Sequence, residues 1–224
     1  MMITIPTLDL LAAVRDTNAF TARDTLTPEA SILLHTTDGW LGVTATTDSK
    51  ATVAATASVA GDGPGWGDDQ FVLTRDGLKH LNAFSGACRR PEGQPPHEIQ
   101  LIVTSGGALQ VLEAGGLFPS TADVVIKPTV DPGDWPIGAV SDAIMGHLDP
   151  SQAPSTLAIA GEWVVRCGQV AARRGEWMRQ HSATNDRCLV SVGPAWTASL
   201  PAVSPGRTRI NATDLLTTDN QKAA

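Results

Sequence analysis

The stretch at residues 75–90 alternates apolar and polar positions with the period of an α-helix and places positive charge beside the apolar face. Its apolar side chains recur every three or four residues: Leu78, Leu81, Phe84 and Cys88. The neighbouring face has basic and polar side chains: Arg75, Lys79, Asn82, Arg89 and Arg90. The pattern predicts a helix that packs on one side and presents cations on the other. His80, beside Lys79, faces either a ligand or solvent.

A second stretch, residues 162–174, repeats this arrangement. Its apolar face contains Trp163, Cys167, Val170 and Ala171, and its neighbouring face contains Arg166, Gln169 and Arg173. The whole chain has 224 residues and a net charge of −7. An acidic balance argues against nucleic-acid binding when charge is spread evenly, but here the cations cluster on two predicted helices.

The order of predicted elements repeats within residues 1–127. A strand near Ile3 and Ile5 precedes a helix at 8–18, for which Thr7 is the expected N-cap. Three strands follow, at 30–35, 40–46 and 51–60. A strand at 70–73, the helix at 75–90 and strands at 98–104, 108–113 and 122–127 then repeat the order. The fold class is therefore α+β, built from repeated units of about 65 residues.

The remaining chain predicts a shortened second domain at 128–203. It contains a short helix at 137–148, a strand at 156–159, the second cationic helix and strands at 187–192 and 195–202. These elements form a third unit, and whether residues 128–154 make a reduced fourth unit stays open. Residues 204–224 are polar, and we expect a disordered tail.

Composition limits the function classes. Three cysteines without CxxC spacing indicate reduced thiols, and no apolar window is long enough to span a membrane, so we expect a soluble, cytoplasmic protein. The five histidines lack metal-ligand spacing, the glycine-rich run at 61–67 lacks the Lys-Ser/Thr of a phosphate loop, and no nucleophile elbow occurs. We expect no enzyme activity, no metal and no cofactor.

Four tryptophans are candidates for a role in packing or in partner binding. Trp163 and Trp196 are expected in the core or an interface. Trp66 and Trp135 lie in predicted loops between Gly, Pro and Asp, where an exposed ring would suit a partner pocket and a buried ring would be structural.

A series of short motifs in residues 8–57 resembles the first domain of bacterial sliding clamps, the β subunits of replicative DNA polymerase. These motifs are a leading helix, the Thr25-Leu26-Thr27-Pro28 turn, the Asp38-Gly39 hairpin and the strand end at 41–48. The resemblance continues through residues 72–81 and covers about 1–115; it is thinner over 150–203, where Ser199-Leu200-Pro201 resembles the closing run of a clamp's last domain.

The resemblance implies a ring whose helices line a hole and whose antiparallel sheets form the outer wall. The family's inner helices direct Lys and Arg to duplex DNA without reading sequence, which matches the clustered cations. The implied DNA-binding residues are Arg75, Lys79, His80, Arg89, Arg90, Arg166, Arg173 and Arg174. The helix at 8–18 lacks the basic face that the family's pattern would give it.

The implied partners are double-stranded DNA, a DNA polymerase and a clamp loader. Three-domain clamps close as dimers and two-domain clamps as trimers, so a whole second domain here favours a homotrimer, with a dimer possible and ring closure uncertain if residues 128–203 make only half a domain. The size suits a replication gene of a phage or plasmid. Two alternatives stay open: a clamp-fold interaction protein that does not encircle DNA, and an unrelated α+β binding module.

Overall fold

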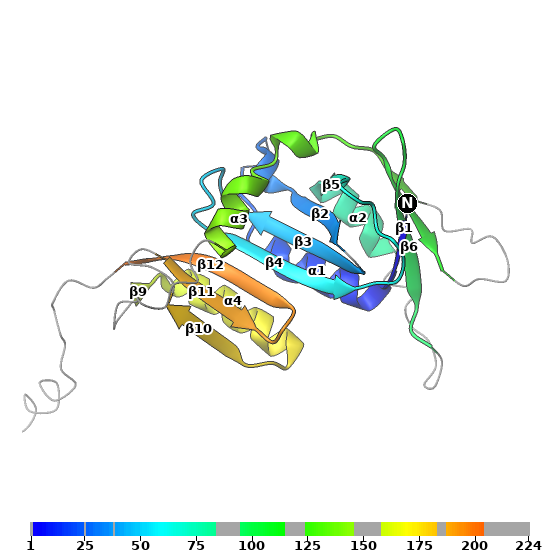
Figure 1. Cartoon of the computed structure of the whole chain (residues 1–224). Coiled ribbons are helices and arrows are strands. Elements are labelled where there is room, and N and C mark those ends of the chain that lie inside the picture. Colours follow the sequence, from blue (N-terminus) through cyan, green and yellow to red (C-terminus); the bar gives the residue numbers. More distant parts are fainter. Residues whose placement is uncertain are drawn as a thin grey trace, which may run out of the picture.

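The computed structural model describes residues 2–24, 26–37, 39–83, 95–114, 124–145, 158–182 and 187–203 (Figure 1). Residues 84–90 of the first cationic stretch, which include Phe84, Cys88, Arg89 and Arg90, lie outside this described part, as does the predicted tail at 204–224.

The first two predicted units are confirmed in order and type. The first unit comprises β1 (Met2–Pro6), α1 (Thr7–Asn18), the short 3-10 helix η1 (Pro28–Ala30), β2 (Ile32–Thr37), β3 (Trp40–Thr46) and β4 (Ala54–Ala60). The second unit comprises β5 (Gln70–Leu73), α2 (Arg75–Ala83), β6 (Glu98–Val103), β7 (Leu109–Glu113) and β8 (Val124–Ile126).

Each of these units lends its first strand to the other unit. β1 pairs antiparallel with β6, so that Ile3 lies opposite Leu101, while β5 pairs antiparallel with β2. The exchange produces the sheet order β1-β6-β7-β8 on one side and β5-β2-β3-β4 on the other. Because each first strand fills the open edge of the other unit's hairpins, the two units stabilise each other and leave neither edge unpaired.

The rest of the chain adds one further set of elements: η3 (Pro132–Asp134), α3 (Ile137–Met145), β9 (Ala158–Ile159), α4 (Gly161–Arg174), β10 (Met178–Ser182), β11 (Arg187–Val192) and β12 (Trp196–Val203). β12 pairs with β4 and thereby extends the second sheet to eight strands in the order β10-β11-β12-β4-β3-β2-β5, with β9 beside β12. Since this sheet and its core are continuous, the division at residue 127 stays a prediction.

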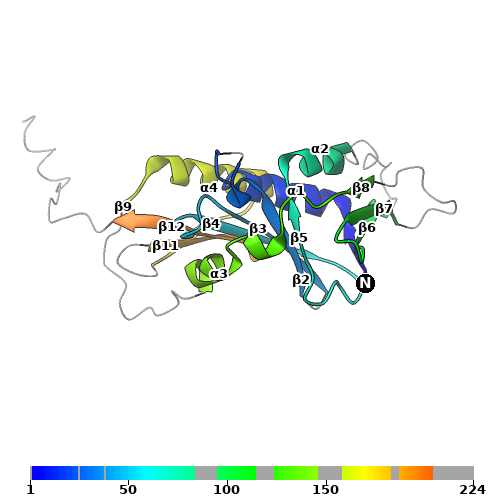
Figure 2. The ribbon, with the colours of Figure 1, turned by 90° about the horizontal axis from the view of Figure 1, so that it is seen from above.

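The large sheet is covered on both faces. Alternate residues of β2 point to opposite sides: Ile32 and Leu34 join the core under α1, α2 and α4, whereas Leu33 joins a second cluster under α3. Figure 2 shows α1, α2 and α4 on one side of the sheet and α3 on the other. The continuous apolar run of β2 is the sequence signature of a strand buried on both faces.

The predicted helix faces are confirmed where they are described. On α4, Cys167 and Val170 are fully buried and Trp163 packs against the core. On α2, Leu81 is buried and Leu78 packs beside it. Burial raises the pKa of the Cys167 thiol to about 12, as expected of a cysteine that serves as a small apolar side chain.

Several local predictions were wrong. Thr7 is not a cap: it is the first residue of α1, its side chain is buried, and its hydroxyl lies 2.7 Å from Nδ1 of His97. β4 begins at Ala54 rather than Ala51, because Ala51 has a φ of 49° in a turn held by Asp48, whose Oδ1 accepts hydrogen bonds from two backbone amides. β10 was missed, since its sequence, MRQHS, has no apolar alternation.

The two loop tryptophans are structural. Trp66 and Trp135 are each only 2% exposed. Trp66 donates from Nε1 to the carbonyl of Leu101, and Trp135 donates to the carbonyl of Ser31. A tryptophan with its N–H satisfied is a stable core residue, so these rings anchor loops to the sheet and do not form an exposed pocket.

His35 makes stability dependent on pH. Its ring packs over Gly42, where an added Cβ would lie 2.3 Å from the ring, and burial lowers the pKa of His35 below its usual 6.5. His35 therefore binds a proton near pH 6.5 in the unfolded chain, whereas in the folded chain it binds a proton only at lower pH. We expect the free energy of unfolding to fall as pH decreases below about 6.5, by at most about 1.4 kcal/mol per pH unit.

Urea unfolding between pH 5 and 8 measures this slope. His35→Gln should flatten it, whereas His80→Gln, at an exposed histidine of α2, should leave it unchanged. If the free energy of unfolding depended on pH equally in both variants, the assignment of this dependence to His35 would be contradicted.

Candidate nucleic-acid interface

A hollow of about 580 Å³ lies where the C-terminal end of α1 meets α2 and α4. It is lined by residues of all three helices and of the segment after α1: Asn18, Ala19, Thr21, Ala22, Arg23, Arg75, Leu78, Lys79, Asn82, Arg166 and Gln169. The polar faces predicted for the two cationic helices therefore meet in space, although they are far apart in sequence.

The charge of this hollow is of one sign. Arg23, Arg75, Lys79 and Arg166 contribute to its wall, and none of the described residues that line it is acidic. In a chain of net charge −7, such segregation creates a local positive potential that attracts polyanions. The remaining polar groups, Asn82 and Gln169, can donate hydrogen bonds to phosphate oxygens.

Arg166 is the most firmly positioned of these cations. Its guanidinium carbon lies 4.4 Å from the ring centroid of Trp163, and Nη1 donates a 2.5 Å hydrogen bond to the carbonyl of Ala19. A further 3.8 Å approach to Glu162 is long for an ion pair. Trp163 in turn stacks on Phe20, with ring centroids 6.0 Å apart. The aromatic pair thus holds one cation of α4 against the end of α1.

The cations of α2 are more exposed to solvent than Arg166. Lys79 forms a 2.7 Å ion pair with Asp76, yet the two side chains are 78% and 83% exposed. The hydrogen bond from Lys79 lowers the pKa of Asp76. An exposed pair of this kind contributes little to stability, so Lys79 can exchange Asp76 for a phosphate at small cost. Arg75 reaches the carbonyl of Ala22 at 3.5 Å, and His80 is exposed outside the lining of the hollow.

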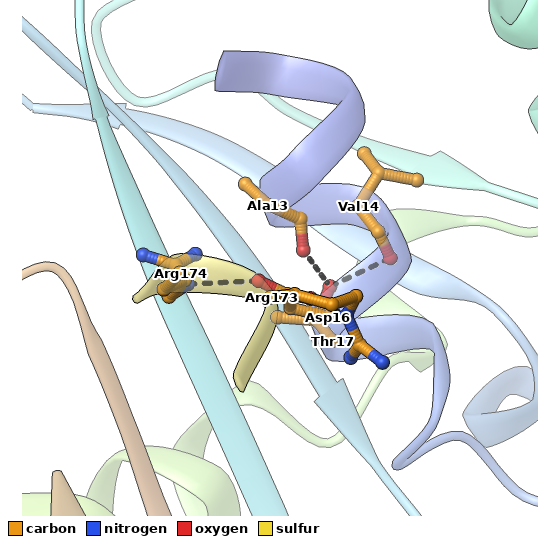
Figure 3. Close-up of polar contacts among 6 residues, drawn as sticks. All are labelled: Ala13, Val14, Asp16, Thr17, Arg173 and Arg174. Atoms are coloured by element: carbon orange, nitrogen blue, oxygen red, sulfur yellow. Dashed lines mark hydrogen bonds and ion pairs between the residues drawn. The ribbon is translucent and has the colours of Figure 1, made fainter. Parts of the chain in front are cut away.

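Arg173 and Arg174 have a different environment (Figure 3). Arg173 donates from Nε to Oδ1 of Asp16, and Arg174 donates from Nε to Oδ2, both at 2.8 Å. Asp16 is fully buried. Each oxygen of one carboxylate thus accepts from one guanidinium, which joins α1 to α4. Their predicted contact with DNA stays untested, but their first role in this geometry is to join the helices.

Sequence reasoning missed Arg23 and the function of Asp16. Arg23 lies in the segment after α1, outside any periodic pattern, and only the fold brings it to the hollow. Asp16 had a usable signal, because it follows Ala13 by three residues and precedes the buried Thr17 directly. A charge at such helix positions indicates a buried partner.

A hydroxyl–imidazole–carboxylate chain also occurs near the start of α1. Thr7 contacts Nδ1 of His97, and Nε2 of His97 lies 3.1 Å from Oε1 of Glu113. Thr7 is fully buried and His97 is 4% exposed, so a substrate has no access to the hydroxyl. These three side chains instead connect α1, β7 and the segment directly before β6. Within the described ranges, no cluster of three or more His, Cys, Asp or Glu side chains could hold a metal ion.

Comparison with solved structures shows that the chain, with its helices packed on antiparallel sheets, has the fold of the DNA polymerase sliding clamps. The β subunit of DNA polymerase III from Pseudomonas aeruginosa superposes with a TM-score of 0.58 at 11% identity, covering 92% of this chain and 66% of that one. The β chain from Streptococcus pneumoniae gives a TM-score of 0.63 at 9% identity, with 96% and 67% covered.

A third structure, the Helicobacter pylori β clamp bound to a DNA ligase peptide, gives a TM-score of 0.53 at 13% identity, covering 92% of this chain and 67% of that clamp. The chain therefore spans about two thirds of the length of these clamps. No family sequence model and no curated protein sequence matches it. Among the described helices, none is long and apolar enough to cross a membrane.

Proposed function

We propose that this protein is a DNA polymerase processivity factor, a non-enzymatic sliding clamp whose oligomeric ring encloses duplex DNA. One observation supports this most: four cations from three segments of the chain line one hollow. The hollow lies on the side of the sheet that carries α1, α2 and α4 (Figure 2). Arg and Lys on such a surface attract phosphates over a distance and read no bases, as sliding requires.

The proposed ring has its helices inside and its sheets outside, and it acts in the cytoplasm with a DNA polymerase and a clamp loader as partners. The Helicobacter pylori clamp was solved with a DNA ligase peptide, which supports a similar role for this chain as a docking site for peptides of replication proteins. Origin from a phage or plasmid stays part of the proposal.

Topological retention on DNA tests this function. The protein is loaded onto nicked circular duplex DNA with its cognate loader or by prolonged incubation, and the complex is separated from free protein by gel filtration. We expect co-elution with circles and rapid loss after the DNA is linearised by a restriction enzyme, because a ring leaves through a free end.

Equal retention on linear and circular DNA would show ordinary surface binding and would contradict a ring. Absence of any retention, combined with tight binding to a polymerase or loader, would favour the alternative of a clamp-fold interaction protein.

A further inference from the structure

A separate pocket of about 440 Å³, the Trp40 pocket, lies at the other end of the α1–α4 pair from the hollow that contains Arg166. It is bounded by the first half of α1, the C-terminal end of α4, the start of β3, the end of β4 and the turn between β11 and β12. Figure 1 shows this turn beside the C-terminal end of α4. The described residues that line the pocket include none that line the hollow, so the two are distinct sites. The volume of the pocket is typical of small-molecule sites, which range from about 300 to 1,000 Å³.

The cations of the Trp40 pocket are held by a buried carboxylate. Arg173 and Arg174 line the pocket, and each donates from Nε to one oxygen of Asp16 (Figure 3). Within the described part of the chain, the terminal Nη nitrogens of these arginines form no hydrogen bond. Because two guanidinium groups share one carboxylate, one positive charge is left over. The pair therefore offers positioned N–H donors to an anion, and phosphate oxygens match the geometry of a guanidinium fork.

An exposed aromatic ring lines the same pocket. Trp40, the first residue of β3, is 50% exposed. Its cross-strand neighbours, Thr37 on β2 and Ala60 on β4, have small side chains, which leave the indole ring uncovered. An open indole face stacks on the planar bases of nucleic acids and accepts any of them.

Two carboxylates complete the pocket. Asp9 on α1 and Glu176, directly after α4, line it, and both are exposed. Glu176 lies across the turn at Gly193, where an added Cβ would be 3.2 Å from the Glu176 side chain. These carboxylates disfavour a ligand that is only an anion. They can accept hydrogen bonds from the exocyclic amino groups of adenine, cytosine and guanine.

The helix dipoles leave the field of the pocket to its side chains. α1 begins at Thr7 and α4 ends at Arg174, and these two helix ends border the pocket together. The positive N-terminal end of α1 offsets the negative C-terminal end of α4. A phosphate beside the two arginines is therefore not repelled by the end of α4.

We propose that the Trp40 pocket binds a nucleotide, with the phosphate on the Nη groups of Arg173 and Arg174 and the base stacked on Trp40. Glu176 or Asp9 accepts a hydrogen bond from the exocyclic amino group of the base. The ligand is either a free nucleotide or an unpaired nucleotide of a DNA strand, since both present the same phosphate and base. This binding site goes beyond the proposed ring and requires neither an oligomer nor an enclosed duplex.

Titration of the full 224-residue chain with deoxyadenosine monophosphate, dAMP, tests the site by calorimetry and by tryptophan fluorescence. We expect saturable binding with a dissociation constant below about 1 mM, together with quenching of the Trp40 emission. Trp40→Ala should raise the dissociation constant by about 10-fold and remove the quenching, whereas Trp40→Phe keeps a stacking ring and should retain most of the affinity. Trp177→Ala, at a tryptophan that is 85% exposed and outside the pocket, is the matched control and should change neither.

The polar half of the pocket has its own test. Arg173→Gln should weaken dAMP binding by about 10-fold, because the phosphate loses one of its two guanidinium partners. Deoxythymidine monophosphate, whose base has no exocyclic amino group, should bind more weakly than dAMP. Circular dichroism establishes that each variant is folded, and the Trp40 variants keep the proposal testable if Arg173→Gln is not.

A single strand of about 12 deoxyadenosines distinguishes the two sources of the nucleotide. Binding at least about 10-fold tighter than dAMP, and weakened by Trp40→Ala, would assign the pocket to an unpaired DNA strand; equal affinity would assign it to a free nucleotide. No saturable binding of dAMP up to about 10 mM, or binding that Trp40→Ala leaves unchanged, would overturn the proposal. Lys79→Glu with Arg23→Glu, in the hollow, should leave dAMP binding intact while it weakens retention on circular DNA, so failure of the ring and failure of the nucleotide site are distinguishable.

Discussion

Replacing Lys79 and Arg166 together with glutamate is expected to abolish retention on circular DNA while leaving the oligomer intact. The two side chains belong to different helices, yet they line one hollow with Arg23 and Arg75. The double substitution changes four units of charge in a wall whose described residues include no acid, so attraction to phosphate turns into near neutrality or repulsion.

The salt dependence gives a quantitative measure of this effect. The slope of log K against log salt concentration is negative, and each lost phosphate contact should make it less negative by about 0.9. The slope of the double variant should therefore be less steep by roughly 2. Filter binding or fluorescence anisotropy on duplex DNA from 50 to 300 mM salt measures it. Lys50→Glu with Lys127→Glu makes the same change of charge at two exposed residues outside the hollow and serves as the control.

Arg166 also contacts Trp163 and the carbonyl of Ala19, so its replacement can disturb folding. Lys79→Glu with Arg23→Glu avoids this problem, because both residues are exposed. An unchanged slope in both double variants, with the control behaving identically, would remove the hollow from consideration as the DNA-binding surface.

The parts of this fold that were predictable from sequence are those set by periodicity. The apolar faces of α2 and α4 follow from side chains spaced every three or four residues, and β2 follows from an uninterrupted apolar run. The repeat of strand, helix and three strands followed from the order of these patterns alone. The cations of α2 and α4 could be assigned to faces for the same reason.

The features that could not be predicted depend on long-range pairing. β10 has no apolar alternation because all its residues whose burial is described are exposed, so a strand there is recognisable only from its pairing with β11. Trp135 lies in a Pro- and Gly-rich segment that indicates a loop, and its burial depends on the carbonyl of Ser31, more than a hundred positions away. Arg23 is brought to the hollow by the turn that follows α1, which no local pattern specifies.

Removal of the Asp16 carboxylate is expected to produce the largest loss of stability of any single substitution considered for this chain. Asp16 is fully buried and accepts one 2.8 Å hydrogen bond on each oxygen, from Arg173 and Arg174. Asp16→Ala leaves two guanidinium groups that are 29% and 18% exposed, without their counter-ion, at the contact between α1 and α4.

Breaking a buried ion pair by removing one partner costs about 3–5 kcal/mol, and because both arginines retain some contact with water we expect the lower end, about 3 kcal/mol. Asp16→Asn keeps an acceptor but loses the charge, so its loss should be smaller. Asp142→Ala, at an exposed acid of α3, controls for removing a carboxylate and should change the free energy of unfolding by less than about 0.5 kcal/mol. Urea denaturation followed by circular dichroism provides the measurement. If Asp16→Ala were as stable as Asp142→Ala, the carboxylate would not hold the helices together, and Arg173 and Arg174 would be free to contribute to DNA binding as the sequence predicted.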